Sequence, residues 1–309
     1  MQIPDGMEEF YGSRASKLLK LNVPIYGTKQ AASCFYQRLV EEVKDRNYKR
    51  SQADPCLYYS WTDGRLFLMV SWVDDLLVLG CKQDVEQAKK DLFAAFECKA
   101  EGVLTEYVGS KISITQLASG LKTVKFTQPV LVQKLKDEFL GETSGAFPKT
   151  PAVAGLVLIK GDGSGALNPE RQTRFRSGTA VMMFMQQWSR PEIYNATRGC
   201  ATQMSAGRLA SEKAMEHTMR YVAATPDRGL LLAPKRIWDG NPDFEFEIHG
   251  RSDSDYATNP DHRRSVSGAR TFLEDTPTVF RSATQKTVSL SVTESEGSAG
   301  VMTAQDMVS

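Results

Sequence analysis

The sequence predicts an α+β fold with an antiparallel sheet, and two observations carry this prediction. Residues 66–73 and 76–79 are short apolar runs rich in leucine, valine and aromatic residues, which is typical of buried strands. Residues 84–96 place apolar side chains along one face at helical spacing, which indicates an amphipathic helix. With the elements before them, the order is helix, strand, turn, strand, strand and helix, which favours an antiparallel α+β layout.

The composition is that of an ordinary globular protein. The 309 residues are enough for about two domains, and 41% are hydrophobic and 24% charged. A net charge of +1 requires any nucleic-acid partner to be held by local basic patches. The five cysteines are scattered without a CxxC pair, and no signal peptide is visible, which together indicate reduced thiols in an intracellular protein. No apolar run approaches the ~18 residues of a membrane span, so no membrane partner is expected.

A pair of acids, Asp74 and Asp75, stands between the two apolar runs at the tip of the predicted hairpin. Adjacent carboxylates between buried strands are costly to desolvate unless a cation or hydrogen bonds compensate them. Mg²⁺ prefers hard oxygen ligands, so this tip is a candidate Mg²⁺ site. A plain surface turn is the alternative, because aspartate is common in turns.

The segment before the acid pair predicts a turn, a helix and a hairpin. Residues 24–27 form the turn, and a helix follows from about Lys29 to Arg46. A strand over 56–61 leads into a hairpin turn at 62–64. Gly27 would let a nucleotide approach the backbone closely, and an ordinary turn before a core helix is the alternative.

The middle of the chain predicts a second strand pair, a helix and a linker. Strands over 106–112 and 121–126 flank a turn at Ser119-Gly120, and a helix runs from Pro129 to Phe139. Residues 141–173 are rich in Gly, Pro, Ser and Thr, which is typical of a linker.

Three helices are predicted next, over 174–188, 191–205 and 210–224. Their methionines are expected to fill the core.

The remaining residues predict an antiparallel sheet followed by a helix. Strands are expected over 244–248, 265–274, 279–282 and 287–292, with the helix starting near Thr293.

The sequence around the acid pair resembles a known family. Residues 25–36 read IYGTKQAASCFY, residues 53–58 read ADPCLY and residues 72–75 read WVDD. These follow the order of the phrases LYGLKQAPRAWY, ADPCxY and YVDD in the reverse transcriptase of copia-type (Ty1/copia) LTR retrotransposons. Tryptophan in place of the family's tyrosine at position 72 is a departure for which we expect a change in packing.

Later segments resemble the RNase H region of the same elements. Residues 252–257 read SDSDYA, residues 263–268 read RRSVSG and residues 290–296 read LSVTESE. The family's corresponding phrases are SDADWA, RRSTSG and LSTTEAE. The resemblance therefore covers essentially the whole chain.

The resemblance implies a two-metal nucleotidyl-transfer site that uses Mg²⁺ (or Mn²⁺). Asp74 would be a direct metal ligand and Asp75 its supporting neighbour. The implied nucleotide- and template-binding residues are Tyr26, Gly27, Lys29 and Gln30.

The resemblance also implies an RNase H metal site. Asp253 would be the strand carboxylate and Glu296 the helix carboxylate that grip Mg²⁺ at the scissile phosphate. Arg263, Arg264 and Lys286 would contact the backbone of the hybrid. For Glu296 the alternative is a capping box with Thr293 at the start of the helix.

The implied domains are a partial right-hand polymerase palm/thumb over 1–140, a linker over 141–173, a helical connection over 174–240 and a partial RNase H-like domain over 241–309. We expect a piece of a longer Pol polyprotein, because neither end of the sequence carries a cap or a tail. The resemblance also implies that one acid of each site lies outside the residues present. Neither DNA synthesis nor RNase H activity is therefore expected from this chain alone.

The implied function is RNA-directed DNA polymerase with ribonuclease H. The implied partners are an RNA–DNA hybrid or template–primer and dNTPs. The implied location is intracellular, either cytoplasmic in a virus-like particle or nuclear. The alternative is a catalytically dead transposon remnant that binds nucleic acid or a protein.

Overall fold

The computed structural model describes residues 22, 24–25, 27–141, 146–238, 240–241 and 243–308. It has the mixed helix and strand content that the sequence predicts. The chain divides into two compact units, Met1–Glu101 (unit 1) and Gly102–Ser309 (unit 2), each described here by itself. Within the described residues, no helix is long and apolar enough to cross a membrane.

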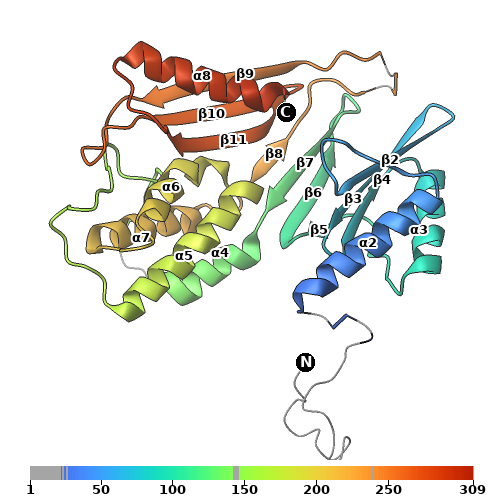
Figure 1. Cartoon of the computed structure of the whole chain (residues 1–309), viewed down its shortest axis with the longest axis horizontal. Helices are drawn as coiled ribbons and strands as arrows, with labels where there is room; N and C mark the ends of the chain where they lie inside the picture. Colours follow the sequence, from blue (N-terminus) through green and yellow to red (C-terminus); the bar gives the residue numbers. More distant parts are fainter. Residues whose placement is uncertain are drawn as a thin grey trace, which may run out of the picture. The chain divides into compact units, whose positions relative to one another are not determined.

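Among its described residues, unit 1 is an antiparallel sheet with two helices (Figure 1). Its sheet has the order β1-β2-β3-β4, which is the chain order. The elements are α2 (Lys29–Asp45), β1 (Lys49–Arg50), β2 (Leu57–Thr62), β3 (Arg65–Trp72), β4 (Asp75–Leu79) and α3 (Lys82–Ala95). The predicted helices and strands of this region are confirmed to within two residues at almost every boundary.

The core of unit 1 is built by strand alternation and helical spacing. The buried apolar side chains come from α2, the sheet and α3, and are Leu39, Val43, Tyr58, Phe67, Met69 and Ala88. Phe67, Met69 and Ser71 alternate along β3 and point inward, as period two requires. This packing anchors the strand that leads to the acid pair.

Unit 2 begins with a second antiparallel sheet of order β5-β6-β7-β8. Its strands are β5 (Glu106–Tyr107), β6 (Ser110–Gln116), β7 (Lys122–Thr127) and β8 (Leu230–Leu232). The predicted strand 106–112 is broken, because Val108 and Gly109 have positive φ of 48° and 68° and turn the chain back. β8 joins β7 although it follows the helices in sequence.

A group of helices lies between β7 and β8 in the sequence. They are α4 (Pro129–Leu135), the π-helical turn η1 (Lys136–Leu140), α5 (Pro169–Trp188), the 3₁₀ turn η2 (Pro191–Ile193), α6 (Tyr194–Thr202) and α7 (Leu209–Ala224). α5 starts five residues before the predicted position. The reason is local, since the Asn168 side chain accepts a hydrogen bond from Arg171 N at 2.9 Å and Pro169 occupies the first turn.

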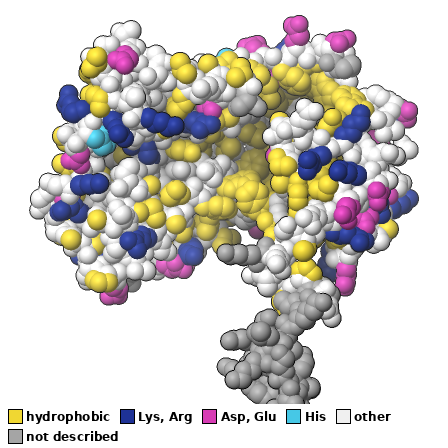
Figure 2. Space-filling view, in the orientation of Figure 1, with side chains coloured by type: hydrophobic (Ala, Val, Ile, Leu, Met, Phe, Trp, Pro, Cys, Tyr) yellow, Lys and Arg dark blue, Asp and Glu magenta, His cyan; other side chains and the backbone are white. Residues whose placement is uncertain are grey.

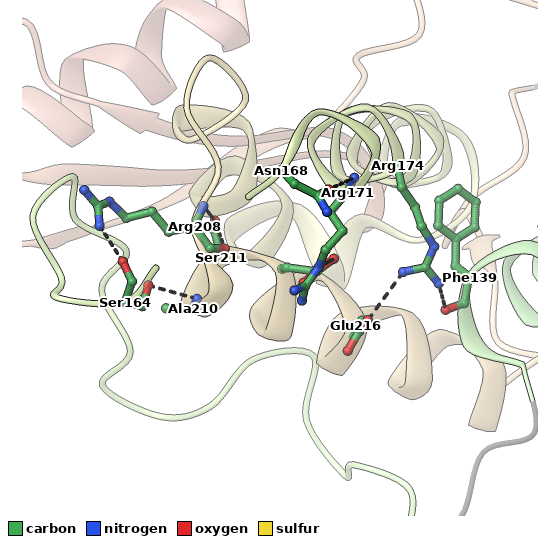
Figure 3. Close-up of polar contacts among 10 residues, drawn as sticks. Phe139, Ser164, Asn168, Arg171, Arg174, Arg208, Ala210, Ser211 and Glu216 are labelled. Atoms are coloured by element: carbon green, nitrogen blue, oxygen red, sulfur yellow. Dashed lines mark hydrogen bonds and ion pairs between the residues drawn. The ribbon is translucent and has the colours of Figure 1, made fainter. Parts of the chain in front are cut away.

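The helices share one apolar core, in which Met182, Met185, Met215 and Met219 are fully buried. Met183 is 40% exposed, so it is not the core filler that the sequence analysis expected. Polar contacts frame this core (Figure 3). Arg174, on α5, contacts both the Phe139 carbonyl of η1 and the Glu216 carboxylate of α7, and it thereby joins these three elements.

The last part of unit 2 is a three-stranded antiparallel sheet of order β11-β10-β9, with a helix packed on β9 and β10. The elements are β9 (Ile248–Asp255), β10 (Val266–Leu273), β11 (Thr276–Thr284) and α8 (Val292–Val308). Two predictions were wrong here. The first strand starts at Ile248 rather than 244, and residues 287–292 form no strand.

Each error has a local cause. The alternating Phe244 and Phe246 contact Arg236 and Trp238 instead of a neighbouring strand. In residues 287–292, Ser291 Oγ accepts a hydrogen bond from Glu294 N at 3.1 Å, which caps α8. The segment is therefore the entry to a helix.

A buried arginine joins three parts of unit 2. The Arg190 side chain is 1% exposed and donates to Glu192 Oε1 at 2.7 Å. It also donates to the Val222 carbonyl at 3.4 Å, and to the Thr225 carbonyl and hydroxyl at 3.2 and 2.6 Å, at the end of α7. The preceding residue, Ser189, donates to Gln128 Oε1 at 2.7 Å. We call these residues the arginine corner.

Arg190→Met is expected to lower the free energy of unfolding by about 3 kcal/mol, because Glu192 and the carbonyls at the end of α7 lose their donor. Arg176→Met is the matched control, since Arg176 lies on the exposed face of α5, and its cost should stay within about 1 kcal/mol. Urea denaturation followed by circular dichroism measures both. Equal losses in the two variants would contradict a special role for the corner.

Candidate metal and nucleic-acid sites

The acid pair lies at the tip of the β3–β4 hairpin, where Trp72 pairs with Asp75. Val73 and Asp74 form the two-residue turn between the strands. Both aspartates are exposed, so they stay hydrated. The desolvation cost that the sequence analysis assigned to acids between buried strands therefore does not arise.

The turn itself is strained, because Val73 has a φ of 56°. A β-branched residue at positive φ is an uncommon conformation, and such strain gathers at functional sites. The hairpin below the turn is anchored by Phe67 and Met69, which are each 2% exposed. A rigid base thus presents two hydrated carboxylates, and hard oxygen ligands of this kind suit Mg²⁺ or Mn²⁺.

The expected nucleotide-binding residues lie at the start of α2. Gly27 has a φ of 88°, and no atom would lie within 4 Å of an added Cβ, so the backbone there is open to a ligand. Gln30 is exposed on the first turn of α2. Tyr26 and the Lys29 side chain lie outside the described residues. Among the residues described in unit 1, no hydrogen bond or ion pair joins Gly27 or Gln30 to the acid pair.

The second acid pair is divided between β9 and α8. Glu296 accepts hydrogen bonds from the backbone N and the Oγ of Ser254, at 3.2 and 3.1 Å. Ser254 Oγ also bonds Ser295 Oγ. The alternative reading, a capping box between Thr293 and Glu296, is not formed, because Ser291 caps the helix and Glu294 accepts a hydrogen bond from Leu290 N at 2.7 Å. Glu296 is thereby free to face the strand.

Asp253 lies on β9 next to Ser254 and is exposed. Ser254 points to α8, and so does Gly250, where an added Cβ would come within 2.4 Å of Thr303 Cγ2. Side chains alternate along a strand, so Asp253 occupies the opposite face. The structure brings Glu296 to the strand of Asp253 but directs the two carboxylates to different sides of it. β9 is an edge strand, so the two faces of the sheet are separated there only by the width of this strand.

The expected nucleic-acid-binding residues gather at one end of the same sheet. Val266 pairs with both Asp255 and Thr284, and Gln285 N donates to Ser265 O at 2.8 Å. These pairings place the exposed side chains of Arg263, Arg264 and Lys286 at the end of the sheet that also carries Asp253.

On the face shown in Figure 2, Lys and Arg side chains are interspersed with acidic and hydrophobic ones. This distribution agrees with the net charge of +1. A phosphate-binding surface would therefore depend on a local cluster such as Arg263, Arg264 and Lys286.

One further cluster was missed by the sequence analysis. Within the described residues, Glu247, His249 and Asp275 form the group of three possible metal ligands that lie within 4.8 Å of one another. The ammonium of Lys235 bonds Glu247 and lies 3.8 Å from Asp275, so a cation already neutralises these acids. Glu247 and His249 at strand spacing were the available signal, but Lys235 and Asp275 are distant in sequence.

A neighbouring ion pair holds the segment that leads into β9. The Glu274 side chain is 4% exposed and accepts from Arg236 Nε at 2.7 Å and from Glu247 N at 2.7 Å. The hydrogen bond from Arg236, followed by that from Glu247 N, lowers the pKa of Glu274 from 4.5 to about 2. Glu274 is thus charged in the folded chain at pH values where an unfolded glutamate is protonated.

Comparison with known proteins shows what the chain is similar to. The family described as reverse transcriptase (RNA-dependent DNA polymerase) matches residues 1–150, which contain the β3–β4 hairpin. The whole chain is 23% identical to the Pol polyprotein of transposon TNT 1-94 of Nicotiana tabacum. The chain is a relative of copia-type retrotransposon Pol polyproteins. The part of the chain that resembles reverse transcriptases is residues 1–150.

The chain is also similar to two other proteins. The Pol polyprotein of transposon RE1 of Arabidopsis thaliana is 24% identical over 95% of the chain. An uncharacterized mitochondrial protein of Arabidopsis thaliana, AtMg00810, is 24% identical over 77% of the chain and 92% of its own length. The chain spans about a fifth of the polyproteins, at 22% of the first and 19% of the second. No solved structure matches the chain.

Glu274→Gln should change how the stability of this Pol segment depends on pH. Because the folded-state pKa is lowered, Glu274 stabilises the fold fully above pH 4.5 and loses that effect as the pH falls toward about 2. The stability difference between the native chain and the variant should therefore shrink over this range. Thermal unfolding at several pH values measures it, with Glu245→Gln, an exposed acid of the same segment, as the control for net charge. A stability difference between the native chain and Glu274→Gln that does not change with pH would contradict a stabilising ion pair at Glu274.

Proposed function

We propose that this chain contributes the metal-holding part of an RNA-directed DNA polymerase, with Asp74 and Asp75 as ligands of Mg²⁺ or Mn²⁺. The observation that carries the proposal is the exposure of both acids on an anchored hairpin within the region that matches the reverse transcriptase family. Reverse transcriptases generally use divalent metal ions and bind a template–primer. Residues 1–140 would serve as the palm and thumb.

The chemistry of this site divides between the metal and the chain. When bound, the metal ions would lower the pKa of the primer 3′ hydroxyl and neutralise charge on the triphosphate. The chain would hold them through the two carboxylates, whose spacing is set by the Trp72–Asp75 pairing of the hairpin. Gly27 and Gln30, together with Tyr26 and Lys29, would position the incoming dNTP and the template.

A second activity, ribonuclease H, is supported by a separate observation. Glu296 bonds Ser254 on the strand that carries Asp253, and Arg263, Arg264 and Lys286 lie at the same end of that sheet. Residues 241–309 would then be an RNase H-like domain, joined through the helices of 174–240 and the linker 141–173. Asp253 would have to reach around the edge of β9 to share a metal ion with Glu296.

The natural partner in both activities would be an RNA–DNA hybrid, together with dNTPs for synthesis. The location would be intracellular, either in a cytoplasmic virus-like particle or in the nucleus. The alternative function is that of a catalytically dead remnant, which would retain nucleic-acid binding without holding a metal ion.

Metal binding tests the polymerase proposal directly. The double variant Asp74→Asn, Asp75→Asn should weaken Mn²⁺ binding to the full chain by roughly tenfold or more, since it removes the anionic ligands. Electron paramagnetic resonance of free Mn²⁺ during a titration gives the affinity. Asp63→Asn is the matched control, because Asp63 is an exposed acid in the neighbouring β2–β3 turn. The proposal fails if the double variant binds Mn²⁺ as the native chain does.

Hybrid binding tests the cluster at the end of the second site. We expect weak, sequence-independent binding to an RNA–DNA hybrid that fades between about 50 and 200 mM salt. Arg263→Ala with Arg264→Ala should reduce the salt slope by roughly one to two units. Fluorescence anisotropy at several salt concentrations measures both, with Arg176→Ala and Lys213→Ala together as a charge-matched control. A hybrid-binding affinity that does not change with salt concentration would contradict phosphate contacts by Arg263 and Arg264.

The two measurements also separate the alternatives. Salt-dependent hybrid binding by a chain that shows no Mn²⁺ binding at Asp74 and Asp75 would favour the catalytically dead remnant. A native chain that binds neither Mn²⁺ nor the hybrid would support neither the polymerase function nor the nucleic-acid-binding remnant.

A further inference from the structure

Unit 2 contains a cavity that none of the sites above uses. Its volume is about 430 Å³, and it is lined by α6, α7, residues 152–160 and the loop that follows β9. Small-molecule sites typically have volumes of roughly 300–1,000 Å³. The cavity is therefore large enough for one small organic molecule and too small for a nucleic-acid duplex.

A largely buried cation, Arg198, lines this cavity. Its Nε donates to Asn195 Oδ1 at 3.2 Å and to Ser282 Oγ at 3.0 Å. Its terminal nitrogens donate to Thr284 Oγ1 at 3.2 Å and to Asn195 Oδ1 at 3.0 Å. All these acceptors are neutral, and among the described residues of unit 2 no carboxylate forms an ion pair with Arg198.

This arrangement leaves a positive charge without a direct counter-ion. Burial lowers the pKa of Arg198, and the more distant Asp255 opposes that effect. A guanidinium carries five N–H donors, and the contacts above leave one on each terminal nitrogen. Two such donors match a phosphate or carboxylate group, which would supply the missing negative charge.

The other walls of the cavity differ in character. Val153 and Leu156 line one side and are 51% and 47% exposed, so apolar surface remains open to a ligand. Asp255, the last residue of β9, and Asn259, in the loop that follows, also line the cavity. A carboxylate in such a position can accept hydrogen bonds from sugar hydroxyls.

We propose that this cavity binds a nucleoside monophosphate, with the phosphate on Arg198, the sugar hydroxyls on Asp255 and the base against Val153 and Leu156. The charges of the lining favour one phosphate group over three. The lining also carries Lys160 and the acids Asp255 and Asp261, and these two acids would repel a longer phosphate chain.

Isothermal titration calorimetry of the full chain with adenosine 5′-monophosphate tests this site. Titration in EDTA excludes phosphate binding through a metal ion at Asp74 and Asp75, so the result does not depend on the polymerase proposal. One binding event is expected, and Arg198→Gln should weaken it at least about tenfold because a charge-assisted contact is lost. Arg176→Gln, which changes an arginine outside the cavity, should leave the affinity unchanged.

A second variant guards against misfolding, since Arg198 also bonds β11. Leu156→Trp fills the cavity and keeps the hydrogen bonds of Arg198, and it should weaken binding by a similar factor in a chain whose circular dichroism is unaltered. Adenosine alone and inorganic phosphate alone should each bind at least about tenfold more weakly, because each lacks one set of contacts. The proposal is overturned if the native chain does not bind the nucleotide, if Leu156→Trp binds it normally, or if inorganic phosphate binds as tightly.

Discussion

The arrangement of unit 2 depends on the arginine corner. Arg190 is almost fully buried, yet its donors meet Glu192 and the polar groups at the end of α7. Ser189 beside it bonds Gln128, which stands between β7 and α4. A buried guanidinium is tolerated only when its hydrogen bonds are satisfied, so the three elements must meet in one geometry. This contact also orients the end of α7, from which the chain returns as β8 to pair with β7.

The two acid pairs are presented by different means. Asp74 and Asp75 are adjacent in sequence, and a hairpin turn is sufficient to expose them together. Asp253 and Glu296 are 43 residues apart in the numbering, and they approach only because α8 packs on β9. In the second case the side of the strand matters, and Ser254 rather than Asp253 meets the helix. Sequence motifs predict which residues belong to a site. The face of the strand on which each side chain lies decides which of them are in contact.

The cavity that contains Arg198 follows from the same packing. Its lining comes from the linker, from α6 and α7, and from the loop after β9, so helices and sheet must pack together before it exists. The bonds of Arg198 to Ser282 and Thr284 link α6 to β11. Arg198 therefore has a structural role as well as the binding role proposed for it, because only some of its donors are used within the protein.

The sequence by itself determined the elements whose signals are local. The hairpin around Asp74 and Asp75, the amphipathic helices α2 and α3, and the family phrases could all be recognised, because periodicity and turn residues act over a few positions. Tertiary structure alone decided the pairing of β8 with β7, the Lys235 and Glu274 contacts, and the face on which Asp253 lies. These depend on residues that are distant in the chain. Residues 244–247 and 287–292 alternate as a strand does, but Phe244 contacts Arg236 and Ser291 caps α8, so alternation over a few residues does not by itself establish a strand.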